Sequence, residues 1–160
     1  MPTRSIDKID IASLEADNVQ IVLRCPFPQC NARIIPYSSK LHPIAVEQAP
    51  SCIEVQDLQY CTTATTAEQI PRLAPVTTKF YQIDDVWDFD NIGVSRPSDA
   101  ISSQTPIMAK NNEQVHVERL LICSECDRGP LGFAGLSTLD DNDHKNLKYF
   151  LSENSVVYVF

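Results

Sequence analysis

Short apolar runs broken by polar positions recur along the chain, and their period predicts strands rather than helices. β-Branched and aromatic residues dominate these runs, as is typical of sheets, and no stretch carries a long helical period. The predicted strands are 19–24, 32–37, 79–85, 115–123, 131–136, 147–152 and 155–160, with a short one around Ile53 to Val55. A tight turn is expected between the last two. The pattern predicts a mainly β domain of antiparallel strands.

Two regions depart from this pattern. Residues 1–18 show no clear periodicity, so we expect a loose N-terminal arm. Residues 38–78 hold four prolines and the polar stretch CTTATTAEQ, so most of this segment is expected to be a surface insertion. The length of 160 residues suits a single domain. We place that domain at 19–160, with the insertion at about 38–78.

Composition and charge narrow the function classes. The chain is 43% hydrophobic and 21% charged, which is typical of globular proteins. The net charge is −8 and the 13 basic residues are scattered, which argues against binding to nucleic acid or to an anionic membrane. No run approaches the ~18 apolar residues of a membrane span. Without an N-terminal apolar stretch or an N-x-[ST] site, we expect a monomeric cytoplasmic protein with reduced thiols.

Four of the cysteines form two short pairs, Cys25–Cys30 in CPFPQC and Cys123–Cys126 in CSEC. Each pair can present two thiolates from one tight turn, and a tetrahedral Zn²⁺ needs four such ligands. Residues 31–122 separate the pairs, so one shared ion would join the start of the domain to its last third. With reduced thiols, one structural zinc is favoured over two disulfides.

The remaining cysteines and the histidines show no site-like spacing. Cys52 and Cys61 lie in the expected insertion without an acid–base partner beside them, so we interpret them as free, dispensable thiols. His42, His116 and His144 lack the spacing of metal ligands or catalytic groups. No catalytic acid or nucleophile emerges from the sequence.

The segment DDVWDFDNIGVS (84–95) surrounds the only tryptophan with four aspartates. Its residues allow two interpretations. One is a plain strand, with Trp87 and Phe89 on one face and Val86 and two aspartates on the other, closed by an Asn/Gly turn. The other is a recognition surface with an aromatic anchor inside an acidic rim. Since four nearby carboxylates repel one another, at least one face must be solvated or meet a cationic partner.

Three segments together resemble a known family. WDFDNIGVS (87–95), LLICSECDRGPLG (120–132) and CPFPQC resemble the Mss-four/Dss-four family, also called Rab-interacting factor, and especially its fungal branch, whose first knuckle is similarly widened. The resemblance implies a β-tent-like fold of coiled antiparallel sheets pinned by one structural zinc. The implied zinc ligands are Cys25, Cys30, Cys123 and Cys126. The N-terminal arm and residues 38–78 lie outside the resemblance.

The resemblance also implies a function. Such a protein binds Rab GTPases of the secretory pathway in their nucleotide-free state, promotes slow release of guanine nucleotide and stabilises the empty GTPase. It is a weak exchange factor or chaperone without catalytic chemistry, recruited to secretory membranes through Rab in vesicle-mediated transport and exocytosis. The implied GTPase-binding residues are Asp85, Val86, Trp87, Phe89, Asn91 and Glu125. Trp87 stands where many relatives have Phe, and Val86 where some have Met.

Two other classes of protein also carry paired cysteines. A zinc-containing methionine sulfoxide reductase would need a reactive cysteine beyond the zinc ligands, and only Cys52 and Cys61 remain for that role. A zinc-ribbon scaffold subunit of a larger assembly would need none. Capture of a Rab, or of a multisubunit complex without Rab, distinguishes these hypotheses.

Overall fold

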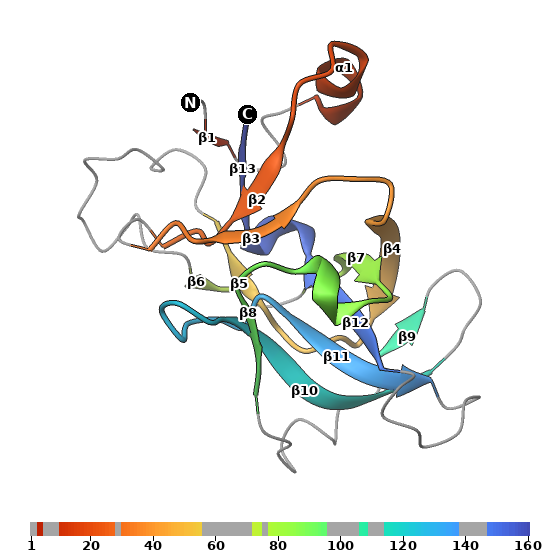
Figure 1. The fold of residues 1–160 in the computed structure, drawn as a ribbon. Helices are drawn as coiled ribbons and strands as arrows, with labels where there is room; N and C mark the ends of the chain where they lie inside the picture. Colours follow the sequence, from red (N-terminus) through yellow and green to blue (C-terminus); the bar gives the residue numbers. More distant parts are fainter. Residues whose placement is uncertain are drawn as a thin grey trace.

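Antiparallel strands are the main regular secondary structure of the described residues, as Figure 1 shows. The computed structural model describes residues 3–4, 10–27, 30–55, 72–74, 77–95, 106–108, 114–137 and 147–160. Every strand pairing within these residues is antiparallel. They form a four-stranded sheet, a seven-stranded sheet and a separate two-stranded pair. The prediction of a mainly β protein with antiparallel sheets is confirmed.

The four-stranded sheet, here sheet A, holds the two ends of the chain and the first cysteine pair. Its order is β1–β13–β2–β3. The bounds are Thr3–Arg4 for β1, Val157–Val159 for β13, Val22–Arg24 for β2 and Arg33–Pro36 for β3. The β2–β3 connection contains Cys25 and Cys30, and the Cys25 amide donates to the Ala32 carbonyl at 2.8 Å. The first knuckle is therefore the turn of a sheet A hairpin.

The seven-stranded sheet, here sheet B, holds the second cysteine pair. Its order is β8–β10–β11–β12–β7–β4–β9. The bounds are Ile92–Val94 for β8, Val115–Cys123 for β10, Gly132–Ser137 for β11, Lys148–Ser152 for β12, Lys79–Ile83 for β7, His42–Glu47 for β4 and Ile107–Met108 for β9. Strands β10 and β11 pair with each other, and the segment between them is the second knuckle. Each sheet therefore contains one hairpin whose turn carries a pair of cysteines.

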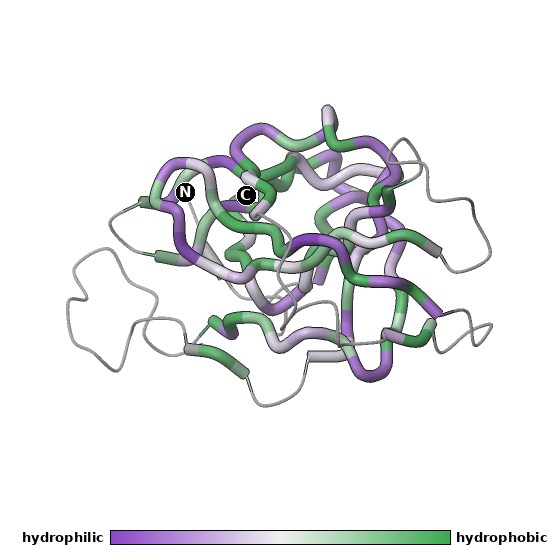
Figure 2. Tube along the Cα trace, turned by 90° about the horizontal axis from the view of Figure 1, so that it is seen from below, coloured by the Kyte–Doolittle hydropathy of each residue, from purple (hydrophilic) through white to green (hydrophobic). Residues whose placement is uncertain are grey.

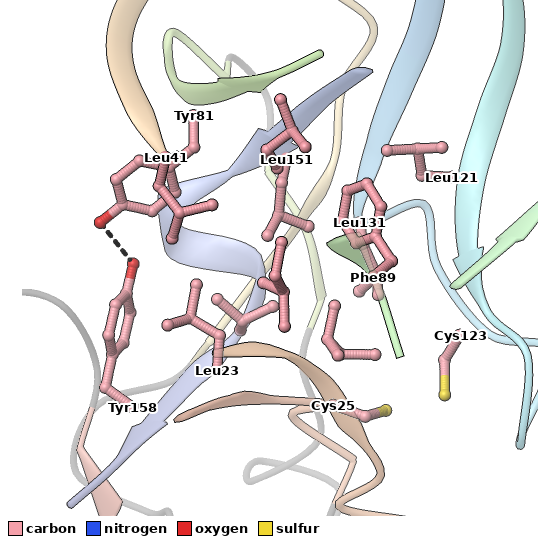
Figure 3. Packing of buried hydrophobic residues seen from close by; sticks show 14 of the residues in the cluster. Leu23, Cys25, Leu41, Tyr81, Phe89, Leu121, Cys123, Leu131, Leu151 and Tyr158 are labelled. Carbon is pink, nitrogen blue, oxygen red and sulfur yellow. Dashed lines mark hydrogen bonds between the residues drawn. The ribbon is translucent and has the colours of Figure 1, made fainter. Parts of the chain in front are cut away.

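Strand alternation divides the buried side chains between two cores. In β7, Tyr81 and Ile83 belong to the larger cluster, whereas Phe80 belongs to the smaller one. In β12, Leu151 and Phe150 divide in the same way. Figure 2 shows hydrophobic and hydrophilic positions following one another along the trace. The larger core draws on both sheets (Figure 3), so burial of one face of sheet B fixes how sheet A packs against it.

One glycine in sheet B is required by a close backbone approach. Gly132 of β11 pairs with Leu151 of β12. A Cβ atom at residue 132 would collide with the carbonyl oxygen of Phe150. Only glycine therefore allows β11 to lie this close to β12 at residue 132.

The last two strands are not a hairpin. A single 3₁₀ turn, Glu153–Ser155, joins them, as the expected tight turn requires. Yet β12 pairs within sheet B and β13 pairs within sheet A. The chain crosses between sheets at this turn, where the hydroxyl of Ser155 donates to the carbonyl of Ile53 at 2.6 Å. Proximity in sequence indicated the turn but not the partners of its strands.

The expectation of a surface insertion at 38–78 is wrong at both ends of that segment. Strand β4 lies inside sheet B. The short strand expected around Ile53 is confirmed as β5 (Ile53–Glu54), which pairs with β6 (Arg72–Leu73). Val46 and Cys52 are fully buried. Pro43 is one of the four prolines that suggested a loop. The Val46 amide bonds to Thr78 on the β7 side, so the nitrogen of Pro43, three positions earlier, faces away from β7. On that side β4 pairs with β9 only at Val46 and Glu47, so a missing amide hydrogen at Pro43 leaves no described partner unsatisfied. Residues 56–71 lie outside the described part of the chain.

The expectation of a loose N-terminal arm also needs correction. The short helix α1 (Ile11–Ala16) begins at Asp10, whose side chain accepts a hydrogen bond from the Ser13 amide at 3.2 Å. Ile11 and Leu14 pack against the larger core, and β1 pairs with β13. A helix of six residues is too short to give a clear periodic signal. None of the described helices is long and apolar enough to cross a membrane.

Candidate metal centre and adjoining loop

The two knuckles bring four cysteines together at one end of the sheets. The Sγ atoms of Cys25, Cys30, Cys123 and Cys126 all lie within 4.8 Å of one another. The shortest separations join the knuckles: Cys25 to Cys126 at 3.7 Å and Cys30 to Cys123 at 3.6 Å. A disulfide would need about 2.0 Å between sulfurs, so these four thiols are free.

The four sulfur positions suit a tetrahedral metal ion. Metal–sulfur bonds of about 2.3 Å give a tetrahedron with sulfur–sulfur edges of about 3.8 Å. The two cross-knuckle separations, 3.6 and 3.7 Å, are close to such edges. Cys25 and Cys123 lie at one end of the buried cluster in Figure 3. The arrangement is therefore that of a metal site with four thiolate ligands.

Each knuckle is closed by the same backbone device. Asn31 follows Cys30 with φ 51°, and Asp127 follows Cys126 with φ 56°. Asparagine and aspartate tolerate this left-handed region better than other residues with a Cβ atom. In addition, the guanidinium carbon of Arg128 lies 5.0 Å from the ring centroid of Phe27, a cation–π contact between the two knuckles. The knuckles thus form two matching turns that also contact each other.

Electrostatics favours a cation at this position. Burial raises the pKa of the Cys25 thiol well above its ordinary value, and the nearby Cys123 and Cys126 add to the shift. A hydrogen bond from the Phe27 backbone acts in the opposite direction. Four negative thiolates at these separations repel one another, so they are stable together only with a positive ion among them. Ligation to that ion keeps the thiols deprotonated.

The acidic–aromatic segment is a turn rather than a strand. Val86–Asp88 forms a 3₁₀ turn, and only Ile92–Val94 beyond it is extended as β8. The Asp85 carboxylate accepts a hydrogen bond from the Trp87 amide at 2.9 Å. The prediction of alternating strand faces is therefore wrong here, because a capping aspartate starts a turn at the point where alternation would continue. We call residues 84–91 the recognition loop.

The two aromatic side chains of the recognition loop have opposite environments. Trp87 is 88% exposed, whereas Phe89 is 8% exposed and belongs to the larger core. The Phe89 ring lies edge-on to Tyr149, with centroids 6.2 Å apart. The Phe89 ring therefore supports the loop from inside, and Trp87 alone of the pair lies on the surface, while a contact of Phe89 with a GTPase stays a prediction.

One basic residue of β3 and one of the segment that follows it neutralise half of the aspartates. Asp90 pairs with Arg33 at 2.8 Å, and Asp88 pairs with Lys40 at 3.0 Å. The Asp90 amide also donates to the carbonyl of Ile34 at 2.8 Å. Lys40 belongs to the segment that joins β3 and β4 and passes beside the turn in Figure 1. The repulsion expected from four carboxylates is therefore relieved within the molecule, which attaches the loop to β3.

The recognition loop ends beside the cysteines. The side-chain amide of Asn91 donates to the main-chain carbonyl of Arg33 at 2.9 Å. The main-chain carbonyl of Asn91 accepts from the main-chain amide of Ser124, in the second knuckle, at 3.2 Å. A shallow cleft of about 470 Å³ lies at this junction. Its lining residues are Cys30, Ala32, Asn91, Glu125 and Cys126. Asn91 and Glu125, which lie far apart in the sequence, thus share one cleft with two of the cysteines.

Comparison with known proteins now identifies the family. The family model described as Mss4 protein matches residues 21–157, which include both knuckles and the recognition loop. The chain belongs to the Mss4 family. It is 36% identical over 67 residues to Protein DSS4 of Saccharomyces cerevisiae. This match covers 36% of the chain and 47% of the relative, so it spans about half of that protein's length.

Membership of the Mss4 family confirms the resemblance drawn from the three sequence segments. Cys52 is a free thiol, as expected, and it is fully buried in the smaller core, while its dispensability stays a prediction. Burial raises the pKa of its thiol to about 12. Among the described residues, the cluster of possible metal ligands consists of the four knuckle cysteines and does not include Cys52. Cys61 lies outside the described residues.

Two residues important for this Mss4-family site escaped the sequence analysis. Arg33 and Lys40 hold the recognition loop through ion pairs, but they precede their partners by 57 and 48 positions. The signal that could have found them is charge balance. Four clustered aspartates require nearby cations, and Arg33 directly follows the first knuckle. Tertiary packing, which brings β3 to the loop, is needed to choose among the basic residues.

Proposed function

We propose that this Mss4-family protein binds Rab-type small GTPases of the secretory pathway in their nucleotide-free state. In this proposal it promotes slow release of guanine nucleotide and stabilises the empty GTPase, as a weak exchange factor or chaperone. It acts as a cytoplasmic monomer that Rab recruits to secretory membranes, and it performs no chemistry of its own. The observation that carries the proposal is the exposed Trp87 on a hydrogen-bonded turn, in a chain of this family.

Trp87 has the properties of an interface anchor. Its side chain is 88% exposed, although a tryptophan ring in water costs free energy that burial would recover. Central aromatic residues often contribute most of the binding free energy of an interface. The cap from Asp85 and the buried Phe89 fix the turn before binding, so less conformational entropy is lost when a partner covers the ring.

Preference for the empty GTPase follows from linkage. A small GTPase holds its nucleotide through phosphate contacts, a lysine and Mg²⁺. A protein that binds the empty form more tightly than the loaded form must weaken nucleotide binding by the same factor. Equal affinity for both forms would shift nothing. A rigid apolar wedge such as Trp87 supplies this difference if it occupies the position of a switch segment only when the nucleotide is absent.

The charges of the loop divide into two groups in this proposal. Asp88 and Asp90 are paired with Lys40 and Arg33, so they position the loop rather than contact the partner. Asp84 and Asp85 are exposed beside Trp87, and Glu125 is exposed on the second knuckle. These carboxylates would repel the phosphates of a returning nucleotide. They would also attract the basic residues of the GTPase that held those phosphates before release.

We further propose that the metal is one zinc ion with a structural role. Cys25, Cys30, Cys123 and Cys126 would hold it, and four thiolates leave no open position for water or substrate. When bound, the ion cross-links the knuckles and lowers the free energy of the folded state. The chain's own contacts then transmit that order, because Ser124 of the second knuckle donates to Asn91 of the recognition loop.

The reductase alternative finds little support in the described residues. A reactive cysteine needs an accessible thiolate. Cys52 is buried, and the pKa of its thiol is raised to about 12, so at neutral pH it is a neutral thiol without access to substrate. A thiol-dependent assay with methionine sulfoxide tests this alternative directly, and turnover would contradict the proposal.

Capture of endogenous GTPases tests the proposed function. Immobilised protein is incubated with cell extract in EDTA without nucleotide, washed, and eluted with GTP and Mg²⁺. We expect Rab-type GTPases in the eluate and fewer of them on a Trp87→Ala column. A column loaded in GDP and Mg²⁺ is the second control. Recovery of a multisubunit complex without any Rab would instead favour a scaffold role.

A further inference from the structure

The four cysteines differ in their access to solvent. Cys25 and Cys123 are fully buried, with 0% exposure. Cys30 and Cys126 are half-buried, and both line the 470 Å³ cleft. One side of the metal site therefore faces the core, and the other faces water through the cleft.

The open side of the site lies next to the recognition loop. Asn91 ends that loop and forms one wall of the cleft, where it is held by Arg33 and Ser124. The exposed Glu125 forms part of the cleft lining from the second knuckle. A partner that seats on Trp87 and reaches Asn91 and Glu125 would therefore lie across the mouth of the cleft.

We propose that the bound GTPase closes this cleft, so that GTPase binding and the rate of metal loss are linked. This inference rests on the proposed function. A competing ligand can reach the ion only by replacing a sulfur on the open side, where Cys30 and Cys126 are accessible. A GTPase that covers the mouth of the cleft blocks this replacement and thus slows metal loss.

Metal release to a coloured chelator measures the linkage. The zinc-loaded protein is mixed with 4-(2-pyridylazo)resorcinol, alone or with the nucleotide-free Rab recovered by capture, and the released ion is followed by absorbance. With the GTPase at ten times its Kd, we expect release to slow about tenfold. The matched control is the same GTPase loaded with GDP and Mg²⁺, which should leave the rate nearly unchanged.

A direct binding measurement under the same conditions separates the two proposals. If the GTPase binds and the release rate stays the same, the cleft remains open in the complex and this inference is overturned while the proposed function stands. If no Rab binds the zinc-loaded protein, the proposed function fails and this inference fails with it. If the GTPase slows metal release from the parent protein but not from the Trp87→Ala variant, both the proposed function and this inference are supported.

A cleft-filling variant tests the access route without any GTPase. Ala32 is half-buried and lines the cleft, so Ala32→Leu, or the milder Ala32→Val, should narrow the route and slow chelator-driven release severalfold. The matched control is Ala45→Leu on an exposed position of β4, a strand separated from β10 by three others in sheet B. Equal release rates in folded Ala32 and Ala45 variants would overturn the cleft as the access route.

Discussion

Trp87 shows how a single side chain can be placed for recognition at little cost to folding. The ring is 88% exposed, so the core gains almost nothing from it. We expect Trp87→Ala to weaken binding of empty Rab by more than about 2 kcal/mol. The free energy of unfolding should change by no more than about 0.5 kcal/mol. Calorimetric titration and thermal unfolding of the zinc-loaded variant measure the two effects. A lowered Tm with unchanged affinity would remove Trp87 from the interface.

Asp85 allows its charge and its hydrogen bond to be tested separately. The carboxylate caps the turn at the Trp87 amide, and asparagine can accept the same hydrogen bond without the charge. If the cap positions Trp87, Asp85→Asn should bind Rab almost normally, whereas Asp85→Ala should lose about 1 kcal/mol of affinity. If the charge instead steers association, both variants should associate more slowly than the parent protein, and their association rates should depend less on salt. Stopped-flow binding at two ionic strengths decides between these outcomes.

At the scale of elements, local pattern predicted several of the longer strands of sheet B. Residues 115–123 were predicted as a strand and form β10 with those bounds. Alternation gave the approximate positions of β7, β11 and β12 as well. It failed for β4, where Pro43 suggested a loop, and for α1, which is too short for a helical period. Pairing between distant strands carries no local signal, so the sheet order had to come from the structure.

The candidate site likewise combines features that local sequence pattern predicts with features that depend on tertiary contacts. Cysteine spacing predicted the four clustered residues, because two pairs of thiols need only two turns to present them. The exposure of Trp87 was compatible with the pattern, but the burial of Phe89 was not foreseen. Alternation assigns faces only to strands, and the cap of Asp85 converts this segment into a turn. The ion pairs to Arg33 and Lys40 depend on tertiary contacts that no local pattern encodes.

Two tyrosines link the sheets and predict how stability changes at alkaline pH. The hydroxyls of Tyr81 in β7 and Tyr158 in β13 lie 3.0 Å apart, and Tyr158 donates to the Glu153 carbonyl. Burial raises the pKa of both above the ordinary value of 10.0, which keeps them neutral in the folded state. Their contribution is therefore complete below pH 10 and is lost as pH rises further, because the unfolded chain releases these protons first.

Matched phenylalanine variants test this linkage. Tyr81→Phe leaves Tyr158 its bond to Glu153, so we expect a loss of about 1 kcal/mol at pH 7. Tyr158→Phe leaves the buried Tyr81 hydroxyl without its acceptor and should cost more. Both variants should lose stability less steeply than the parent above pH 10. Urea unfolding from pH 7 to 11 provides the comparison, and parallel slopes for all three proteins would contradict the assignment.

At the scale of the whole molecule, the metal centre and the larger core join the same two sheets. One cysteine pair belongs to the β2–β3 hairpin of sheet A, and the other belongs to the β10–β11 hairpin of sheet B. Within the described residues the chain itself crosses between the sheets twice, in the β3–β4 connection and at the 3₁₀ turn Glu153–Ser155 between β12 and β13. Without an ion, sheet A would be held to sheet B by core packing, the tyrosine pair and the Arg128–Phe27 contact. The recognition loop, which bonds to both hairpins, depends on their relative position.

Removal of one ligand should therefore disrupt both stability and binding. We expect elemental analysis to give one zinc per chain, and Cys126→Ser to lose the metal and to unfold or aggregate, because metal binding and folding are coupled at such sites. Acid should act in the same direction: ligation requires thiolates, so protonation releases the ion as pH falls. Cys52→Ala is the matched control, since this buried thiol lies in the smaller core and should lower stability without changing metal content. A folded, Rab-binding Cys126→Ser protein would show that the two hairpins hold the loop without a metal.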